Sequence, residues 1–278
     1  MGTPVIRGTF HFHSTYSHDG KNTLSEIASA LSASGFSFCV MTEHFEDFDE
    51  VKFDRYVKEA KQVTEGSGFL LIPGVEVDLS GLHTIVFPVR EYAEIVRFAS
   101  DGQDSNGPIF KVLAHPSKYS FEKVVRHIEK YKIDAIELWN QQADGRHMPP
   151  IDFLERLKGQ PWRNQCRYFF GCDLHSVKLV ASNAISVPNA YKPTPESIAK
   201  TLIDGDFVTS NGPTGIDYRN GSGRTDFDTW LEKLRTKPNL KGRILAGVRS
   251  CLKPMYRMLP RSMRHSLNDV KNFVRDKV

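Results

Sequence analysis

The stretch Gly8–Gly20, GTFHFHSTYSHDG, places several metal-binding side chains directly after a short apolar run. His11 and His13 stand two positions apart, and His18 and Asp19 follow shortly after them. On a β-strand, side chains two positions apart point to the same side, so both imidazoles can bind one ion. The stretch therefore predicts a strand that ends at a metal site, and it leaves open whether His18 or Asp19 takes part.

The same arrangement recurs along the chain, because later apolar runs also end in His, Asp or Glu. These later clusters are Thr42-Glu43-His44, Gly74-Val75-Glu76, Ala114-His115-Pro116 and Asp173-Leu174-His175. In a parallel α/β barrel, the carboxyl ends of the strands open onto one face, and that face carries the active site. We therefore expect five segments to deliver imidazoles and carboxylates to one mouth. Such mixed ligands suit zinc, manganese or iron without selecting sharply among them.

The regular alternation of apolar runs with amphipathic segments predicts an α/β fold with a parallel sheet or barrel. We expect a first helix between the capping-box residue Thr23 and Gly35. Further helices are expected at 51–65, 121–131, 151–158 and 195–204. Strands are expected at 5–12, 36–41, 69–77, 83–87, 109–114, 135–138, 168–171, 184–187 and 207–210. The link 78–82 lacks a clear helix, so the barrel should be irregular.

The composition is that of a soluble globular enzyme, with 40% hydrophobic and 25% charged residues among 278. No run is long enough to span a bilayer, and the N-terminus lacks the charged and apolar regions of a signal peptide. The cysteines are far apart and form no CxxC pair, which favours reduced thiols over disulfides or a zinc knuckle. They are Cys39, Cys166, Cys172 and Cys251. We therefore expect a cytoplasmic protein.

The charge is distributed unevenly along the chain. Residues 233–278 contain 13 Lys and Arg against two acids, a net charge of +11, whereas the remainder has 24 basic and 31 acidic residues, or −7. We expect a catalytic domain over 1–213, a linker over 214–232 and a basic helical C-terminal extension over 233–278. The extension is either a solvated helix on the barrel or a surface that binds an anionic membrane or a partner. Few aromatic residues interrupt it, so nucleic acid is a poorer partner.

The five ordered clusters together resemble the PHP family, named for polymerase and histidinol phosphatase domains. The match begins with His11-Phe12-His13, continues through Ser14-Thr15-Tyr16-Ser17 to Asp19-Gly20, and includes all four later clusters. It covers roughly residues 5–213, in the family's order. The resemblance implies a distorted (β/α)7 barrel that binds two or three divalent ions, Zn, Mn or Fe. It also implies phosphoester hydrolysis by a metal-bound hydroxide.

The resemblance also implies which residues bind the metal ions, and it selects Asp19 rather than His18. The implied ligands are His11, His13, Asp19, His44, Glu76, His83, His115, Asp173 and His175. His83 is the loosest placement, because its distance from the bridging glutamate varies in the family. We expect Glu76, Asp173 and His115 to act directly in catalysis. One departure is Glu43, since the second motif is usually Thr-Asp-His, and the extra methylene would shift a hydrogen bond to a ligand.

Other polar residues near the predicted strand ends have less certain roles in the sequence. Glu137 ends the strand at 135–138, where we interpret it as structural or as a partner of a ligand. Lys118, Arg146 and His147 lie in loops after strands, where each would either hold a phosphate or be ordinary surface charge. His127 and His265 are interpreted as structural and solvated residues, respectively.

The leading functional hypothesis is a phosphoesterase that acts on a small phosphomonoester, through hydrolysis by water activated at the metal site. One alternative is an exonuclease or cyclic-nucleotide phosphodiesterase, although the net charge of −7 disfavours a long polyanion. A metal-dependent amidohydrolase also begins with His-x-His. A third class is a non-catalytic, metal-binding regulatory domain tethered through the basic extension. Histidinol phosphate, nucleotides and sugar phosphates all remain candidate substrates.

Overall fold

The computed structural model describes residues 5–102, 109–164, 166–179, 181–188, 192–218 and 223–236. The chain divides into two units, Met1–Leu234 and Arg235–Val278, and the architecture below is that of the first unit. Residues 237–278, which hold most of the predicted basic extension, lie outside the described residues. The role of that extension therefore stays a prediction.

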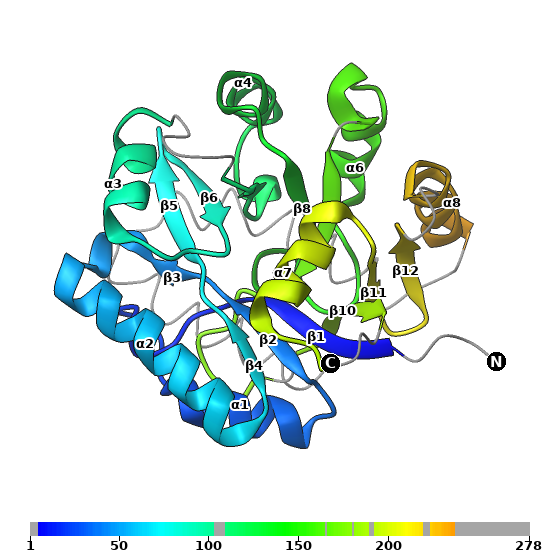
Figure 1. Cartoon of the computed structure of the whole chain (residues 1–278). Coiled ribbons are helices and arrows are strands. Elements are labelled where there is room, and N and C mark those ends of the chain that lie inside the picture. Colours follow the sequence, from blue (N-terminus) through cyan, green and yellow to red (C-terminus); the bar gives the residue numbers. More distant parts are fainter. Residues whose placement is uncertain are drawn as a thin grey trace, which may run out of the picture. The chain divides into compact units, whose positions relative to one another are not determined.

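The described strands form two mixed six-stranded sheets (Figure 1). The first sheet has the order β12-β11-β10-β1-β2-β4 and the second has the order β3-β5-β6-β7-β8-β9. The strands of the first are β12 (Thr214–Asp217), β11 (Val208–Asn211), β10 (Asn183–Pro188), β1 (Val5–Phe12), β2 (Phe38–Met41) and β4 (Leu70–Ile72). Those of the second are β3 (Glu43–His44), β5 (Val75–Leu79), β6 (Leu82–Val86), β7 (Lys111–Leu113), β8 (Ala135–Asn140) and β9 (Arg167–Gly171).

Two connections join the sheets into one ring of strands. On one side, β2 continues through Thr42 into β3, and β4 continues through residues 73–74 into β5. On the other side, the backbone N–H groups of Cys172 and Leu174 donate to the carbonyls of Phe10 and His11. Neighbouring strands thus follow one another from β1 through β2/β3, β4/β5, β6, β7 and β8 to β9 and back to β1. This arrangement agrees with the α/β fold that the sequence predicts and with the distorted barrel that the family resemblance implies.

The irregularity of the barrel lies where the sequence placed it, in the link after β5. Ser80 and Gly81 turn the chain with φ values of 58° and 80°, the left-handed conformations of a tight hairpin. Because no helix separates the two strands, β6 runs antiparallel to both β5 and β7. The other neighbours in the ring are parallel, so most of the strand ends still open toward one side.

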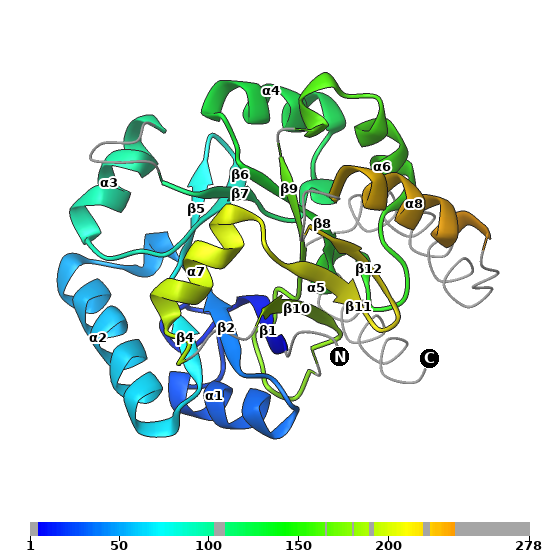
Figure 2. The same ribbon diagram turned by 45° about the vertical axis from the view of Figure 1, so that its right-hand side comes forward.

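The predicted helices form close to their expected positions. They are α1 (Leu24–Ala33), α2 (Glu50–Ser67), α4 (Phe121–Tyr131), α6 (Ile151–Lys158) and α7 (Pro195–Asp204). Four of them lie around the strands in both views, whereas α7 lies across the middle of each view (Figures 1 and 2). Thr23 and Glu26 form the expected capping box at the start of α1. Helix α3 (Tyr92–Asp101) was not predicted, although its buried Ile95 and Phe98 stand three positions apart. No described helix combines the length and apolar character needed to cross a membrane.

A layer of aromatic side chains fills the ring of strands. Phe10 stacks on Phe169 with ring centroids 4.9 Å apart, and Phe169 stacks on Phe207 at 4.8 Å. Phe87 packs edge-on against Phe10 at 5.7 Å. Because Phe10 directly precedes His11 on β1, this close-packed layer gives the following residues a rigid support.

The expectation of a linker over 214–232 is wrong. Residues 214–217 form β12, which pairs with β11 as a hairpin, and residues from 223 onward belong to α8 (Gly223–Thr236). Phe227, Trp230 and Leu231 are buried, with the spacing of one helix face. This apolar face is hidden in the sequence by a Gly-, Asp- and Arg-rich background, which led to the linker interpretation. The other domain boundaries stay predictions.

Helix α8 should contribute substantially to the stability of the first unit. Trp230 is buried and packs against Phe170 with ring centroids 5.0 Å apart. We expect Trp230→Ala to lower the free energy of unfolding by about 3–5 kcal/mol, as for other buried aromatics. Denaturant titration followed by circular dichroism measures this change. The control Val51→Ala, at a side chain that is 68% exposed, should change it by less than about 0.5 kcal/mol. An equal effect of both substitutions would contradict the packing of α8.

Candidate metal centre

The nine implied ligands gather at the ends of the strands, and we refer to them as the cluster. Their ligand atoms form three overlapping groups, in each of which all atoms lie within 4.8 Å of one another. The groups are His13, Asp19, His44 and His175; His11, His13 and Asp173; and His11, Glu76 and His115. His83 joins through Nδ1, which lies 2.9 Å from Oε1 of Glu76. His11 and His13 each belong to two groups, so the three groups are contiguous.

Glu76 lies at the centre of the cluster. Its side chain is 2% exposed, and its oxygens lie 2.9–3.7 Å from one nitrogen of each of five imidazoles. Those imidazoles belong to His11, His13, His44, His83 and His115. A carboxylate has two oxygens with several lone pairs, so Glu76 can bridge two ions. This is the position that the resemblance implies for it.

In the structure, Asp19 belongs to the cluster and His18 does not. Oδ2 of Asp19 lies 3.0 Å from Nε2 of His175 and 3.4 Å from Nε2 of His44, inside the first group. The His18 ring is 63% exposed and its Nδ1 pairs with Asp47 at 2.8 Å, although it also stacks on the ring of His44. Gly20 permits this loop, because a Cβ there would lie 1.8 Å from the carbonyl oxygen of Ser14. His18 is thus a neighbour of the cluster rather than a member.

The charges within the cluster are strongly coupled. Burial alone would raise the pKa of Glu76 and of Asp173, but the imidazoles around them, His11 first, hold both values well below the ordinary range. Burial lowers the pKa of His13 to about 4. Burial would also lower the pKa of His44, but Asp19, Glu76 and Glu46 outweigh it and raise the value to about 9. The buried carboxylates therefore stay ionised and attract positive charge.

Several imidazole nitrogens of the cluster lack the partners that buried polar atoms normally have. Within the part of the chain that the structure describes, five buried ring nitrogens of the cluster form no hydrogen bond of ordinary geometry, although four of them lie within 3.7 Å of a Glu76 oxygen. They are Nε2 of His11 and His13 and Nδ1 of His44, His83 and His115. Leaving a buried polar atom unsatisfied costs about 1–3 kcal/mol, so such atoms need an explanation. Divalent ions provide one, because imidazole nitrogens and carboxylates are their common ligands.

Three members of the cluster have an unusual backbone conformation. His11, His115 and Asp173 have φ values of 71°, 30° and 52°, in the left-handed region that residues with a Cβ rarely adopt. Each costs on the order of 1–3 kcal/mol, and such residues are concentrated at functional sites. The strand ends therefore turn these side chains into the cluster at a local cost, which the surrounding structure must offset.

Glu137 and Asn140, both on β8, support the cluster from behind. Glu137 accepts from Nδ1 of His11 at 3.0 Å and from the backbone N–H of His115 at 2.7 Å. Asn140 donates its amide to Glu137 at 2.8 Å and to Asp173 at 3.4 Å. Gly171 leaves room for Glu137, since a Cβ there would lie 1.4 Å from Oε1. The sequence suggested Glu137 as such a partner but missed Asn140, whose only signal is its position at the end of the same strand.

The three candidate phosphate-binding residues differ in their relation to the cluster. Nζ of Lys118 lies 3.4 Å from Oδ2 of Asp173, and the side chain is 43% exposed. The carbonyl of Arg146 instead accepts from the side chain of Asn211, at the end of β11, and His147 is exposed. The structure thus places Lys118 next to the cluster, between a ligand and solvent. The roles of Arg146 and His147 stay predictions.

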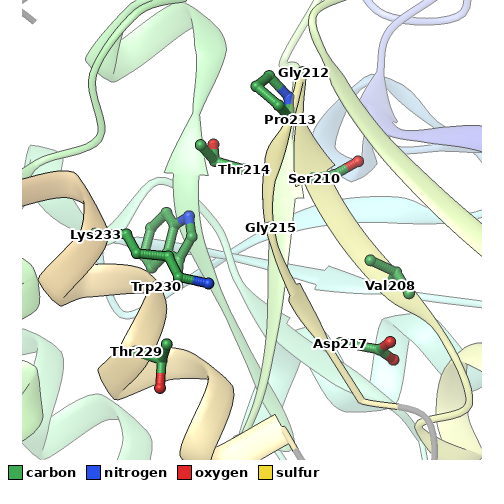
Figure 3. A pocket seen from close by; sticks show the side chains of 10 residues that line it. All are labelled: Val208, Ser210, Gly212, Pro213, Thr214, Gly215, Asp217, Thr229, Trp230 and Lys233. Atoms are coloured by element: carbon green, nitrogen blue, oxygen red, sulfur yellow. The ribbon is translucent and has the colours of Figure 1, made fainter. Parts of the chain in front are cut away.

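A pocket of about 380 Å³ lies elsewhere, between the β11–β12 hairpin and α8 (Figure 3). Trp230, Lys233 and Thr229 line it from the helix, and Ser210 and Asp217 are among the residues that line it from the hairpin. None of its lining residues belongs to the cluster. The pocket is therefore separate from the candidate metal centre.

Comparisons with known proteins agree with this architecture. Residues 9–143 match the family model of the PHP domain, whereas no curated protein sequence matches the chain. Endonuclease Q, solved with a 27-mer duplex carrying an abasic lesion, is similar in structure with a TM-score of 0.51 and 16% identity. That match covers 73% of this chain but only 57% of endonuclease Q, and at this identity it indicates a shared fold alone.

Two further solved structures are similar at a lower level. PsfC from Pseudomonas syringae PB-5123 matches with a TM-score of 0.48 and 12% identity, over 83% of this chain and 99% of PsfC. A candidate metal-dependent phosphoesterase from Bifidobacterium adolescentis matches with a TM-score of 0.43 and 15% identity, over 72% of this chain and 97% of that protein.

The positions of Asp19 and His18 predict different results of substitution. Asp19→Ala removes a carboxylate of the first group, so we expect less bound metal after dialysis, measured by elemental analysis. His18→Ala removes an exposed ring, so metal content should stay close to that of the wild type. The reverse result would mean that the loop between residues 14 and 20 has a different register from the one described.

The pKa of His44 predicts that metal binding depends on pH. With a pKa of about 9, metal-free His44 is protonated at pH 7 and must lose its proton to become a ligand. We expect binding to release a proton from His44 at pH 7, and this release should disappear as the pH rises through 9. His13, with a pKa of about 4, should release none at either pH. Calorimetry in buffers of different ionisation enthalpy measures the release, and equal values at pH 7 and pH 10 would contradict the expectation.

Proposed function

We propose that the chain, whose residues 9–143 match the family model of the PHP domain, is a metal-dependent phosphoesterase acting on a small phosphomonoester. The observation that carries the proposal is the arrangement around Glu76. One buried carboxylate stands within 3.7 Å of five imidazoles, in a cluster that offers three overlapping groups of ligands. A site for several divalent ions suits phosphoester hydrolysis better than a site for one.

The residues of the cluster have distinct tasks in such a reaction. Bound divalent ions would supply Lewis acidity and activate a water molecule for attack on phosphorus. Glu76, His115 and Asp173 would be among the residues that hold the ions next to the reacting phosphate. Glu137 would orient His11, because it accepts the proton on Nδ1 and leaves Nε2 free as a ligand.

The surroundings of the cluster favour a small substrate over a long polyanion. Outside the cluster, the exposed acid Glu46 lies against His44, and Asp47 pairs with His18 nearby. These carboxylates would repel a phosphate backbone that crosses this side. Lys118 is a cation beside Asp173, a member of the second group, so its charge would attract a single phosphate bound next to it.

A substrate panel tests this proposal. The protein is loaded with manganese or zinc and assayed on an aryl phosphate, an aryl phosphodiester, a cyclic nucleotide and a single-stranded oligonucleotide. We expect hydrolysis of the monoester above all and its loss in His11→Ala. Preferred cleavage of the oligonucleotide or the cyclic nucleotide would favour a nuclease or phosphodiesterase instead. Stoichiometric metal without hydrolysis of any ester would favour a regulatory domain, and an absence of bound metal would contradict the proposed site.

Lys118 provides the second arm of the same experiment. Lys118→Ala should raise KM for the monoester by about 10-fold or more, the effect of losing a charged hydrogen bond to phosphate. The metal content should stay unchanged, because Lys118 is not a ligand. Lys200→Ala is the matched control, since Lys200 forms an exposed pair with Asp204 on α7. An unchanged KM in Lys118→Ala would exclude a phosphate contact for this residue.

A further inference from the structure

Glu43 occupies the position where the chain departs from the usual second motif, and its carboxylate is fully buried. Four hydrogen bonds reach it, all from the loop that follows β1. The backbone N–H of Ser14 donates to both oxygens at 3.0 Å, the Ser14 hydroxyl donates to Oε1 at 2.6 Å, and the Ser17 hydroxyl donates to Oε2 at 2.7 Å. Glu43 is therefore a fixed acceptor that joins β3 to this loop.

Ser17 is the link between Glu43 and the cluster. Its oxygen also accepts from the backbone N–H of His44 at 2.9 Å and lies 3.3 Å from Nδ1 of His13. A hydroxyl has one proton, and the short contact to a carboxylate is the stronger hydrogen bond, so that proton belongs to Glu43. Nδ1 of His13 must then be the donor to Ser17. The proton on Nδ1 leaves Nε2 of His13 as the free lone pair. This nitrogen lies 3.5 Å from an oxygen of Asp173 and 3.7 Å from one of Glu76, and it forms no hydrogen bond of ordinary geometry.

We propose that Glu43 and Ser17 form a positioning relay that fixes the tautomer of His13 and the backbone of His44 for the group of His13, Asp19, His44 and His175. The same serine also anchors Asp19, because Ser17 and Gly20 close consecutive turns through backbone hydrogen bonds of 3.0 and 3.2 Å. Two of the four members of this group, His13 and His44, thus contact the buried Ser17 hydroxyl, and Asp19 is held through the backbone of the same residue. Residues behind a metal ligand commonly set its tautomer and orientation in this way.

The extra methylene of Glu43 belongs to this relay. The side chain of an aspartate is shorter by one carbon–carbon bond, about 1.5 Å. Hydrogen bonds of 2.6–3.0 Å do not survive a retraction of that size at both serines, since such bonds weaken steeply beyond their ordinary length. Glu43→Asp should therefore weaken the relay without removing the negative charge. The relay explains why glutamate suits this chain at this position.

This inference rests on the proposed function, because it assumes that the cluster binds metal ions, but it has a readout that needs no metal. In metal-free protein labelled with ¹⁵N-histidine, NMR shifts should identify His13 as the Nδ1–H tautomer. Ser17→Ala should lose that tautomer, whereas Ser17→Thr keeps the hydroxyl and should retain it. Metal affinity of Ser17→Ala, measured by competition with a chromophoric chelator, should fall about 10- to 100-fold for one class of site.

A matched control separates the relay from a general loss of stability. The hydroxyl of Ser182 donates to Gln141 at 2.8 Å and accepts from Asn211 at 3.2 Å, so its environment resembles that of Ser17 without a cluster member. Ser182→Ala should leave both the His13 tautomer and the metal affinity unchanged. The relay is overturned if wild-type His13 is the Nε2–H tautomer, or if Ser17→Ala behaves like Ser182→Ala. A wild type that shows the tautomer but binds no metal would instead contradict the proposed function alone.

Discussion

The burial of Glu76 is the constraint on which the rest of the site depends. An ionised carboxylate cannot be taken out of water without partners of opposite charge or strong donors. Both oxygens of Glu76 lie within 3.6 Å of imidazole nitrogens. These imidazoles come from β1, the end of β3, β6 and the residues that follow β7. The acid therefore ties four elements of the ring to one point, and it does so only if positive charge is present there.

Two features of the fold hold the cluster around Glu76, a packed aromatic layer and an unusual backbone conformation. Below the cluster, the stacked rings of Phe10 and Phe169 give the strands a dense apolar support. At the cluster itself, the backbone of His11, His115 and Asp173 is held in the left-handed region, where it turns three ligands inward. The packing of the aromatic layer offsets the backbone strain at the cluster. Functional sites with strained residues are commonly supported by well-packed surroundings in this way. A divalent ion would add further stabilisation by satisfying the ring nitrogens that lack partners.

Short-range patterns in the sequence predict the strands and the five segments that contribute to the cluster, whereas Asp19 and His83 are implied only by the family resemblance. Apolar runs define the strands, and the ligands directly follow those runs, as at His11 and His44. The link after β5 was also recognisable, since no helical pattern separates it from β6. The sequence could not predict the partners of the ligands, such as Asn140, because a lone amide at a strand end has no distinguishing pattern. The sequence also did not indicate α8, because the buried Trp230 is surrounded by charged residues in the chain.

The most informative residue is one that departs from the family pattern. Glu43 could be recognised in the sequence as unusual, but its meaning required the position of Ser17, which lies 26 residues away in the chain. Because both serines of the first loop give their protons to Glu43, the hydrogen-bond directions leave His13 with one consistent tautomer. A single methylene is thereby coupled to the lone pair on Nε2 of His13 through two hydrogen bonds. Differences between members of one fold in metal preference can arise at this distance from the ion, where the ligands themselves are unchanged.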